Sequence, residues 1–443
     1  MARLAETRTL AALAAPIVVT QVGAMMLGVV DMLMVGSLGR EALAAASLGT
    51  LWTMGTLVLG QGVVLGMDPV LTQAHGAGDG RAVGLALQRG LVVAAAAGLP
   101  VTLLWAATEP ALILVGQDPH LAALAGDYVR VQLPSAGFYL GFTALRSYLQ
   151  GRGIVAPGLW VTVVANLLNA LFNWALIFGH LGFPALGLVG AGIATGITRS
   201  LMFILLGLLV WRARLYDGAW LAWSRAAVDR RGLVEILGHG VPVGLQLGLE
   251  VWAFQGATVL AGWLGDAELA AHTVALNLAS LSFMVPLGIG IAAVTRVGNL
   301  IGAGDRRAAQ RAAWVALAMG AAVMTVSAVT FVSLRHALPG LYTDDPAVLA
   351  LAAAALPIAG TFQLLDGTQV VGGGILRGMG RTRPAALFNL VGYYAIGLPV
   401  GYWLAFEAGM GLPGIWWGLT IGLAVVAASL VAWIAARGPA HAR

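Results

Sequence analysis

The chain has 443 residues, of which 59% are hydrophobic and only 10% are charged. Soluble globular proteins carry about 25% charged residues, so this composition, with a mean hydropathy of +0.88, predicts an integral membrane protein. The absence of cysteine excludes disulfides and thiolate metal sites. A net charge of +5 is compatible with nucleic-acid binding, but the hydropathy overrides it, and we expect no nucleic-acid partner.

Runs of about 20 apolar residues are long enough to cross a bilayer as helices. The length of these runs and their lack of alternation favour helices over a β-barrel. The first run is too long for the core of a signal peptide, so we expect it to remain as the first helix. In chain order, we predict twelve spanning helices at about 10–35, 43–70, 84–108, 120–145, 156–179, 188–211, 234–262, 270–295, 310–334, 347–375, 385–406 and 413–436.

The basic residues support this count of helices. All 24 of them are arginine, and most lie in short loops or at helix ends. With twelve helices and both termini in the cytoplasm, most of the arginines fall on the cytoplasmic side, as the positive-inside rule requires. One missed helix would destroy this bias, so we predict a multi-pass protein with both termini cytoplasmic.

The chain repeats itself at an offset of about 226 residues, half its own length. The Gly-Ala-Gly-Asp segment at 76–79 recurs at 302–305, and Pro16 recurs as Pro242. Each repeat holds an even number of predicted helices, so both enter the membrane in the same direction and are related by an axis along the membrane normal. We therefore predict an all-α fold with two parallel six-helix repeats: an N-lobe at 1–211, a cytoplasmic linker at 212–233 and a C-lobe at 234–443.

Three acids lie inside the predicted helices without an obvious neighbouring base: Asp31, Glu250 and Asp366. An ionised side chain at the bilayer centre costs at least ~2.5–3.5 kcal/mol, so such residues normally face an aqueous cavity or a partner. These carboxyls can take a proton, hold Na⁺ or pair with an organic cation, and each role excludes the others. Alternatively, each acid has a purely structural role, in which a partner side chain satisfies it. All three break the internal symmetry, because the equivalent positions hold Ala257, Ala24 and Tyr139.

Polar residues in the helix at 156–179 form a second group. Asn169 and Asn173 are four residues apart and share one face of that helix, and Asn166 lies nearby. Buried amides need hydrogen-bond partners, so they either bond neighbouring helices or complete a cation site with Asp31.

Other polar residues have simpler interpretations. We expect Arg130 to pair with Asp127, Arg199 to be structural, and His272 to be a packed polar residue more than a proton carrier. The sequence holds no Walker, Gly-x-Ser-x-Gly or His-Glu-x-x-His motif, so we expect no enzyme.

Several segments resemble the multidrug and toxic compound extrusion (MATE) family, in particular its NorM-like branch. The resemblance covers essentially the whole chain. Four parts of the chain carry the resemblance. The first is 16–49, which contains Val30-Asp31, and the second is 271–288, which begins with Ala-His-Thr-Val-Ala-Leu-Asn and ends with Pro-Leu-Gly. The third is 296–298 with the Gly-Ala-Gly-Asp segment that follows it, and the fourth is 376–378 together with 397–399.

This resemblance implies a twelve-helix antiporter of two lobes that needs no cofactor and expels organic cations and other amphiphiles in exchange for H⁺ or Na⁺. Asp31 looks like the family's coupling acid in the first helix, with Asn169 and Asn173 as its partners. Glu250 and Asp366 match the paired acids of the cation site in the C-lobe. Na⁺ would thus lie at one of these two groups.

Weaker site candidates follow from the same comparison. Phe362 stands where some NorM-like relatives have a tyrosine one turn before the helix-ten acid, and the lost hydroxyl favours H⁺ over Na⁺. His272 and Asn277 lie in the longest matching segment, and Tyr139 is the repeat counterpart of Asp366.

We therefore predict a monomeric multidrug efflux antiporter of the bacterial inner membrane, with small organic cations as substrates. The alternative is a flippase for lipid-linked precursors, which would need cationic residues in its cavity to hold a pyrophosphate. Only Arg130 and Arg199 lie within predicted helices, against three lone acids, so a cationic cargo fits better.

Overall fold

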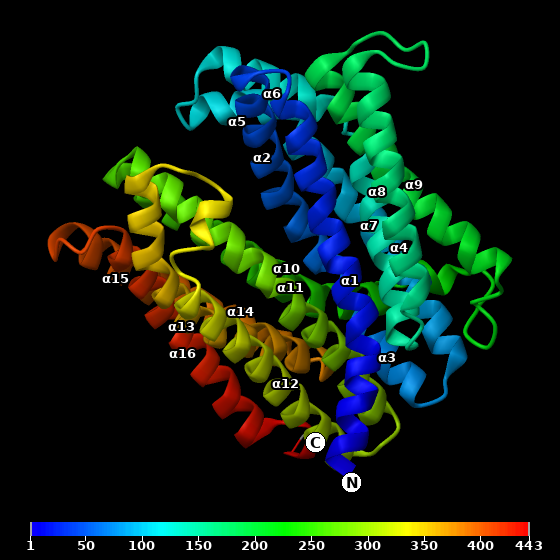
Figure 1. Cartoon of the computed structure of the whole chain (residues 1–443). Coiled ribbons are helices and arrows are strands. Elements are labelled where there is room, and N and C mark those ends of the chain that lie inside the picture. Colours follow the sequence, from blue (N-terminus) through cyan, green and yellow to red (C-terminus); the bar gives the residue numbers. More distant parts are fainter. Residues whose placement is uncertain (1, 442–443) are drawn as a thin grey trace. The chain divides into compact units, whose positions relative to one another are not determined.

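The computed structural model describes residues 2–441, which are almost entirely helical and contain no β-strand (Figure 1). The predicted lobes also include Met1, Ala442 and Arg443, which lie outside the described residues. The helices of the first repeat are α1 (Ala2–Gly36), α2 (Arg40–Val64), α3 (Met67–Gly76), α4 (Gly80–Ala106), α5 (Thr108–Leu114), α6 (Pro119–Arg130), α7 (Ser135–Gly151), α8 (Ala156–Phe178), α9 (Gly187–Arg212) and the short η1 (Arg225–Val228).

The second repeat has the same order of long helices. They are α10 (Arg230–Leu264), α11 (Asp266–Gly302), α12 (Arg306–Ser333), η2 (Pro339–Leu341), α13 (Pro346–Gly378), α14 (Thr382–Asn389), the π-helical η3 (Leu390–Gly397), α15 (Leu398–Tyr402), the π-helical η4 (Trp403–Glu407), α16 (Leu412–Arg437) and η5 (Pro439–His441).

Eleven helical segments in the described part of the chain are long and apolar enough to cross a membrane. The predicted span at 120–145 is missing from this count because it forms two shorter helices, α6 and α7, joined by a turn at 131–134. Pro134 lies directly before α7 and has no N–H to donate to the carbonyl of Arg130 one turn earlier, which weakens the helix at this turn. The predicted 43–70 helix is likewise divided, with α2 ending at Val64 and α3 beginning at Met67, but Arg40–Gly76 still counts as one candidate span.

The repeated Gly-Ala-Gly-Asp segment has the same structural role in both repeats. Asp79 accepts a hydrogen bond from the backbone N–H of Ala82 at the start of α4, and Asp305 accepts one from Ala308 at the start of α12. The glycine before each aspartate, Gly78 or Gly304, adopts a φ of +75° or +81°, a conformation that glycine adopts without a steric cost. The motif thus ends one helix and caps the next.

Cα packing divides the chain into two units. The N unit is Val19–Gly244, and the C unit is Met1–Val18 with Leu245–Arg443, within the described residues. Both divisions fall inside long helices, after Val18 in α1 and after Gly244 in α10. These two residues are one repeat offset apart, and each lies two residues after a repeated proline, Pro16 or Pro242. The first helix of each repeat therefore divides its packing between the two units. The predicted lobes at 1–211 and 234–443 remain a prediction.

Glycines hold the first half of α10 within the N unit. A Cβ built on Gly62 of α2 would lie 2.3 Å from the Cα of Gly244, and one on Gly66 would lie 2.4 Å from the nitrogen of Gly240. Gly240 and Gly244 of α10, four residues apart, thus lie against Gly62 of α2 and Gly66, the residue directly before α3. Such spacing is what close helix contact in lipid requires.

The first half of α1 is held in the C unit by an equivalent contact and an ion pair. A Cβ on Gly288 of α11, the repeat counterpart of Gly62, would lie 2.5 Å from Cγ2 of Val18. Near the start of α1, Glu6 accepts two hydrogen bonds from Arg296 of α11, at 2.6 and 2.9 Å. A bidentate arginine–carboxylate pair is strong and directional, so it fixes this end of the helix.

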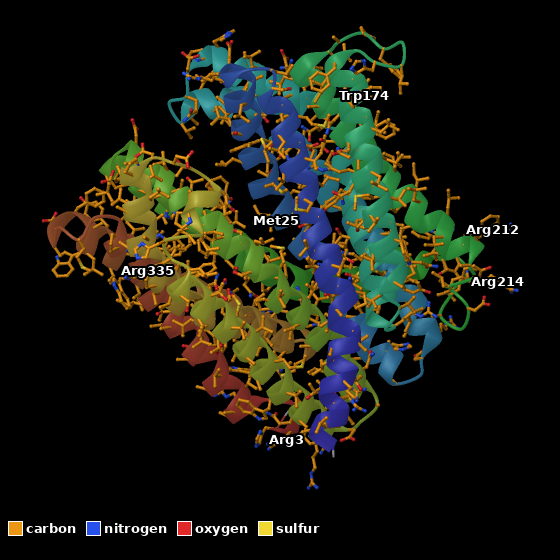
Figure 2. All side chains as sticks on the ribbon, viewed as in Figure 1. Arg3, Met25, Trp174, Arg212, Arg214 and Arg335 are labelled. Carbon is orange, nitrogen blue, oxygen red and sulfur yellow. The ribbon has the colours of Figure 1, made fainter. Side chains whose placement is uncertain are left out.

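The segment predicted as a linker is packed against the N unit. Gln88 of α4 donates to the carbonyl of Leu221 at 2.7 Å, and Tyr148 of α7 donates to that of Ala219 at 3.1 Å. Arg212 and Arg214, by contrast, extend outward where α9 ends (Figure 2). The connection is therefore a structured strap with exposed charges at its start.

Two glycines of α10 provide a matched test of the close helix contact. A Cβ on Gly240 would lie 2.1 Å from the carbonyl oxygen of Val63, whereas one on Gly238 would have nothing within 4 Å. Both alanine substitutions gain the same helix propensity, about 1 kcal/mol. We expect Gly240→Ala to lower the midpoint of thermal unfolding in detergent, because overpacking costs about 1–3 kcal/mol, and Gly238→Ala to leave it unchanged or higher. Equal midpoints would contradict the packing described.

Candidate functional site

Asp31 lies at the centre of a buried hydrogen-bond network in the N unit. Its Oδ1 accepts a hydrogen bond from the amide nitrogen of Asn173 at 2.5 Å, and its Oδ2 accepts one from the hydroxyl of Thr195 at 2.8 Å. The same amide nitrogen donates to Oδ1 of Asn169 at 3.2 Å. The structure thus brings together Asp31, Asn169 and Asn173, from α1 and α8, as the sequence analysis grouped them. Asn166 instead donates to the backbone carbonyl of Gly23.

Thr195 of α9 was missed by the sequence analysis, because a threonine in an apolar helix is unremarkable. Its hydroxyl has two acceptors within reach, Oδ2 of Asp31 at 2.8 Å and the carbonyl oxygen of Ala191 at 3.0 Å. A hydroxyl has one proton to donate. It can therefore donate to an ionised Asp31, or donate to Ala191 while accepting a proton from a neutral Asp31. Either protonation state of Asp31 is satisfied with the same heavy-atom positions.

Arg199 lies one turn beyond Thr195 and is close enough to interact electrostatically with Asp31. It donates to Gln132 at 3.0 Å, and its guanidinium lies 5.4 Å from the ring centroid of Trp105 and 5.8 Å from that of Tyr139. Contacts of this kind stabilise a buried arginine through the faces of the rings. Arg199 is thus held by side chains, as a structural role requires, and Asp31 has a base nearby after all.

The C unit holds the second acidic site. Glu250 of α10 and Asp366 of α13 are both buried, and they line the same cavity of about 200 Å³. Phe254 and Phe362, each one helical turn from one of these acids, line the cavity as well. The site therefore combines two carboxyls with aromatic walls.

Amides surround Glu250. Gln369 of α13 donates to its Oε2 at 2.9 Å, and the same nitrogen lies 3.5 Å from Oδ1 of Asn389. Asn389 in turn donates to the carbonyl of Gln246 at 3.4 Å. The sequence analysis missed Gln369 and Asn389. The argument applied to Asn169 and Asn173, that a buried amide needs a partner, would have found them, because Gln369 lies one turn after Asp366.

The weaker candidates lie in different places. Of these residues, only Phe362 lines the acidic cavity. His272 is buried, 3.2 Å from the hydroxyl of Thr258 and packed against Trp416. Asn277 is exposed on α11, and Tyr139 lies in the N unit beneath Arg199. Arg130 pairs with Asp127 at 2.6 Å, as predicted.

Metal binding by acids and histidines alone has no support. No group of three or more His, Cys, Asp or Glu side chains that could hold a metal ion occurs among residues 2–441. A cation in either site would therefore need amide or hydroxyl oxygens in addition to carboxylates.

The bond between Thr195 and Asp31 can be tested with a neighbour on the same helix. Thr195→Val is nearly isosteric but leaves Oδ2 of Asp31 without its donor, which costs about 1–3 kcal/mol for a buried group. Thr198 is also buried, yet its hydroxyl donates only to the backbone carbonyl of Ala194. We expect Thr195→Val to lower the midpoint of thermal unfolding in detergent clearly more than Thr198→Val. The combination with Asp31→Asn should lose less stability than the two single losses together, and strict additivity would contradict a direct bond.

Comparisons with known proteins agree with this architecture. The MatE family profile matches residues 16–175 and 242–403, one match in each repeat. The chain is 40% identical to the multidrug resistance protein NorM of Burkholderia vietnamiensis, over 96% of this chain and 92% of that protein. It is 35% identical to multidrug and toxin extrusion protein 1 of Xenopus tropicalis, over 94% of this chain and 71% of that protein.

Solved structures give the same result. The crystal structure of the eukaryotic MATE transporter AtDTX14 superposes with a TM-score of 0.91 at 26% identity, over 98% of this chain and 96% of that one. An outward-facing multidrug resistance MATE transporter superposes with a TM-score of 0.90 at 21% identity, over 99% and 97%, which shows the shared fold. The expected MATE-like fold is confirmed. The chain belongs to the MatE family of membrane transporters, which are not enzymes.

Proposed function

We propose that this transporter is a multidrug efflux antiporter, which expels organic cations and other amphiphilic drugs in exchange for H⁺ or Na⁺ by alternating access. The relatives named for multidrug resistance support the efflux of drugs. The observation that carries the proposal of cation exchange is the presence of three buried carboxyls, Asp31, Glu250 and Asp366, in two separate networks. Each would alternate between a coupling cation and a competing partner.

The cavity in the C unit supports a cationic drug as substrate. Its carboxyls supply negative charge, and Phe254, Phe283 and Phe362 supply aromatic surface. An organic cation is attracted by both, because ring faces are electronegative and a desolvated cation–π contact is worth about 2 kcal/mol. A bound H⁺ or Na⁺ would neutralise the carboxyls and weaken that attraction, which couples release of the drug to entry of the ion.

The network around Asp31 supports proton exchange without rearrangement. Thr195 can donate to the ionised carboxylate or accept from the protonated one, as its two acceptors allow. In the N unit, proton binding would therefore change the direction of a hydrogen bond and the local charge, while the side chains keep their places.

The arginines argue against a flippase for lipid-linked precursors. Arg130 is paired with Asp127 and with Glu109, and Arg199 is held by Gln132 and two aromatic rings. Neither lines the acidic cavity, so a pyrophosphate would meet carboxyls there. The bacterial relatives favour the inner membrane as its location, and the distribution of the arginines favours cytoplasmic termini; a monomer remains part of the proposal.

Transport into everted vesicles tests this function. Uptake of a radiolabelled lipophilic cation should follow an imposed ΔpH or Na⁺ gradient. Asp31→Asn and Glu250→Gln should each reduce the gradient-driven rate by about tenfold or more, since one lost ion pair of about 1.4 kcal/mol changes binding tenfold.

The matched control is Asp344→Asn, an acid in an exposed turn, which should transport normally. Normal rates in both site variants would refute their coupling roles, and uptake that ignores both gradients would exclude an antiporter.

A further inference from the structure

A long apolar groove runs along the N unit, between α4, α7 and α9. Its volume is about 710 Å³, and on α4 it extends from Leu91 to Thr102, which is the polar residue of the lining. Leu99 and Phe138 lie on its walls and are 65% and 41% exposed, so the groove is open to the surroundings of the unit. Asp31 does not line it. The groove is thus separate from the buried acid of this unit, and the proposed function gives it no role.

Glycines on α4 and α7 create the hollow. A Cβ built on Gly98 would lie 3.0 Å from the Cα of Gly137, and one built on Gly141 would lie 2.8 Å from the ring of Phe203 on α9. Small residues of this kind let helix backbones approach closely in lipid. A Cβ built on Gly137, by contrast, would have nothing within 4 Å. Since Gly137 lines the groove, a larger side chain at this position would extend into it.

The groove lies within the membrane-spanning part of the unit and has the length of one leaflet. Both α4 and α9 are long and apolar enough to cross a membrane. Leu91 and Thr102 are eleven residues apart on α4, which corresponds to about 16 Å of helix. The hydrocarbon core of a bilayer is about 30 Å thick, and one leaflet contributes half of it. A single acyl chain therefore matches the groove in length as well as in polarity.

The equivalent place in the C unit holds a smaller groove, of about 340 Å³, between α12 and α13. Asp118 and Asp345 cap α6 and α13 and fix the repeat offset in this region at 227 residues. By this offset, three residues that line the larger groove have counterparts that line the smaller one: Leu133, Pro134 and Gly137 correspond to Gly360, Thr361 and Leu364. The repeated scaffold thus forms the groove twice, and leucine replaces glycine where it is smaller.

We propose that the groove between α4, α7 and α9 binds one acyl chain of a membrane lipid. Hydrocarbon surrounds the spanning helices, and a groove left unfilled would cost its lining the dispersion contacts of a packed chain. Leu99, Phe138 and Phe203 supply these contacts from three helices. The lining offers a charged drug no carboxylate, which favours a lipid tail over a transported cation. This binding site does not depend on the antiport proposed above.

A photoreactive lipid tests the site. The full-length protein is reconstituted in vesicles of phosphatidylethanolamine and phosphatidylglycerol, with a trace of phosphatidylethanolamine that carries a diazirine in the middle of one acyl chain. Mass spectrometry then locates the labelled residues, which we expect in 91–102 and 133–141. Gly137→Leu should lower this labelling, relative to the rest of the chain, by about tenfold, which corresponds to 1.4 kcal/mol.

Two further variants separate the groove from a general effect of an added or removed side chain. Gly238→Leu also adds a leucine where a Cβ would have nothing within 4 Å, with the same gain in helix propensity, and should be labelled like the wild type. Leu364→Ala removes the side chain that occupies the equivalent position of the smaller groove. It should increase the labelling of α12 and α13.

The lipid site is overturned if Gly137→Leu and Gly238→Leu are labelled alike, or if the wild type is not labelled in 91–102 and 133–141. Loss of the label in the presence of excess lipophilic cation would assign the groove to a drug instead. A photoreactive phenylalanine analogue at position 138 should become joined to lipid. A covalent dimer formed from that position would assign the groove to a second copy of the chain, and either of these assignments also overturns the proposal.

Discussion

A carboxylate buried in a lipid-embedded helix bundle needs donors or a cation, and the arrangement of both units depends on how this need is met. In the N unit, an amide and a hydroxyl solvate Asp31, and Arg199 adds charge at a distance. In the C unit, Glu250 has amide donors, while Oδ1 of Asp366 has none. Both oxygens of Asp31 thus have protein donors whereas one oxygen of Asp366 has none, although both units come from one repeated scaffold.

This difference explains why a duplicated protein retains unequal halves. The shared parts are structural: the aspartates that cap α4 and α12, and the close contacts at Gly62 and Gly288. The acids stand at different positions of that frame, with Ala257, Ala24 and Tyr139 as their counterparts. Different surroundings give different tasks, so the two sites can respond to different cations or at different stages of a transport cycle.

Site residues could be predicted from the sequence where the side chain is costly to bury in lipid, but not where the residue type is common in membrane helices. Asp31, Glu250 and Asp366 were found because a charge in a membrane helix demands an explanation. Thr195 was not, because hydroxyls are common in such helices, and only the fold shows which of them bonds an acid. The break within the predicted span at 120–145 has a similar cause. Hydropathy reports only that these residues are apolar, whereas the structure divides them into α6 and α7, with Pro134 directly before α7.

The exchanged helix halves have a consequence for the assembly of the chain. Residues of 1–18 pack in the C unit and 230–244 in the N unit, so neither half of the gene encodes a complete unit. Two polypeptides separated at the strap would have to trade helix ends to assemble, as partners in a domain-swapped dimer do. A protein with a single copy of the repeat would complete its unit only by exchanging the first half of its first helix with a second copy.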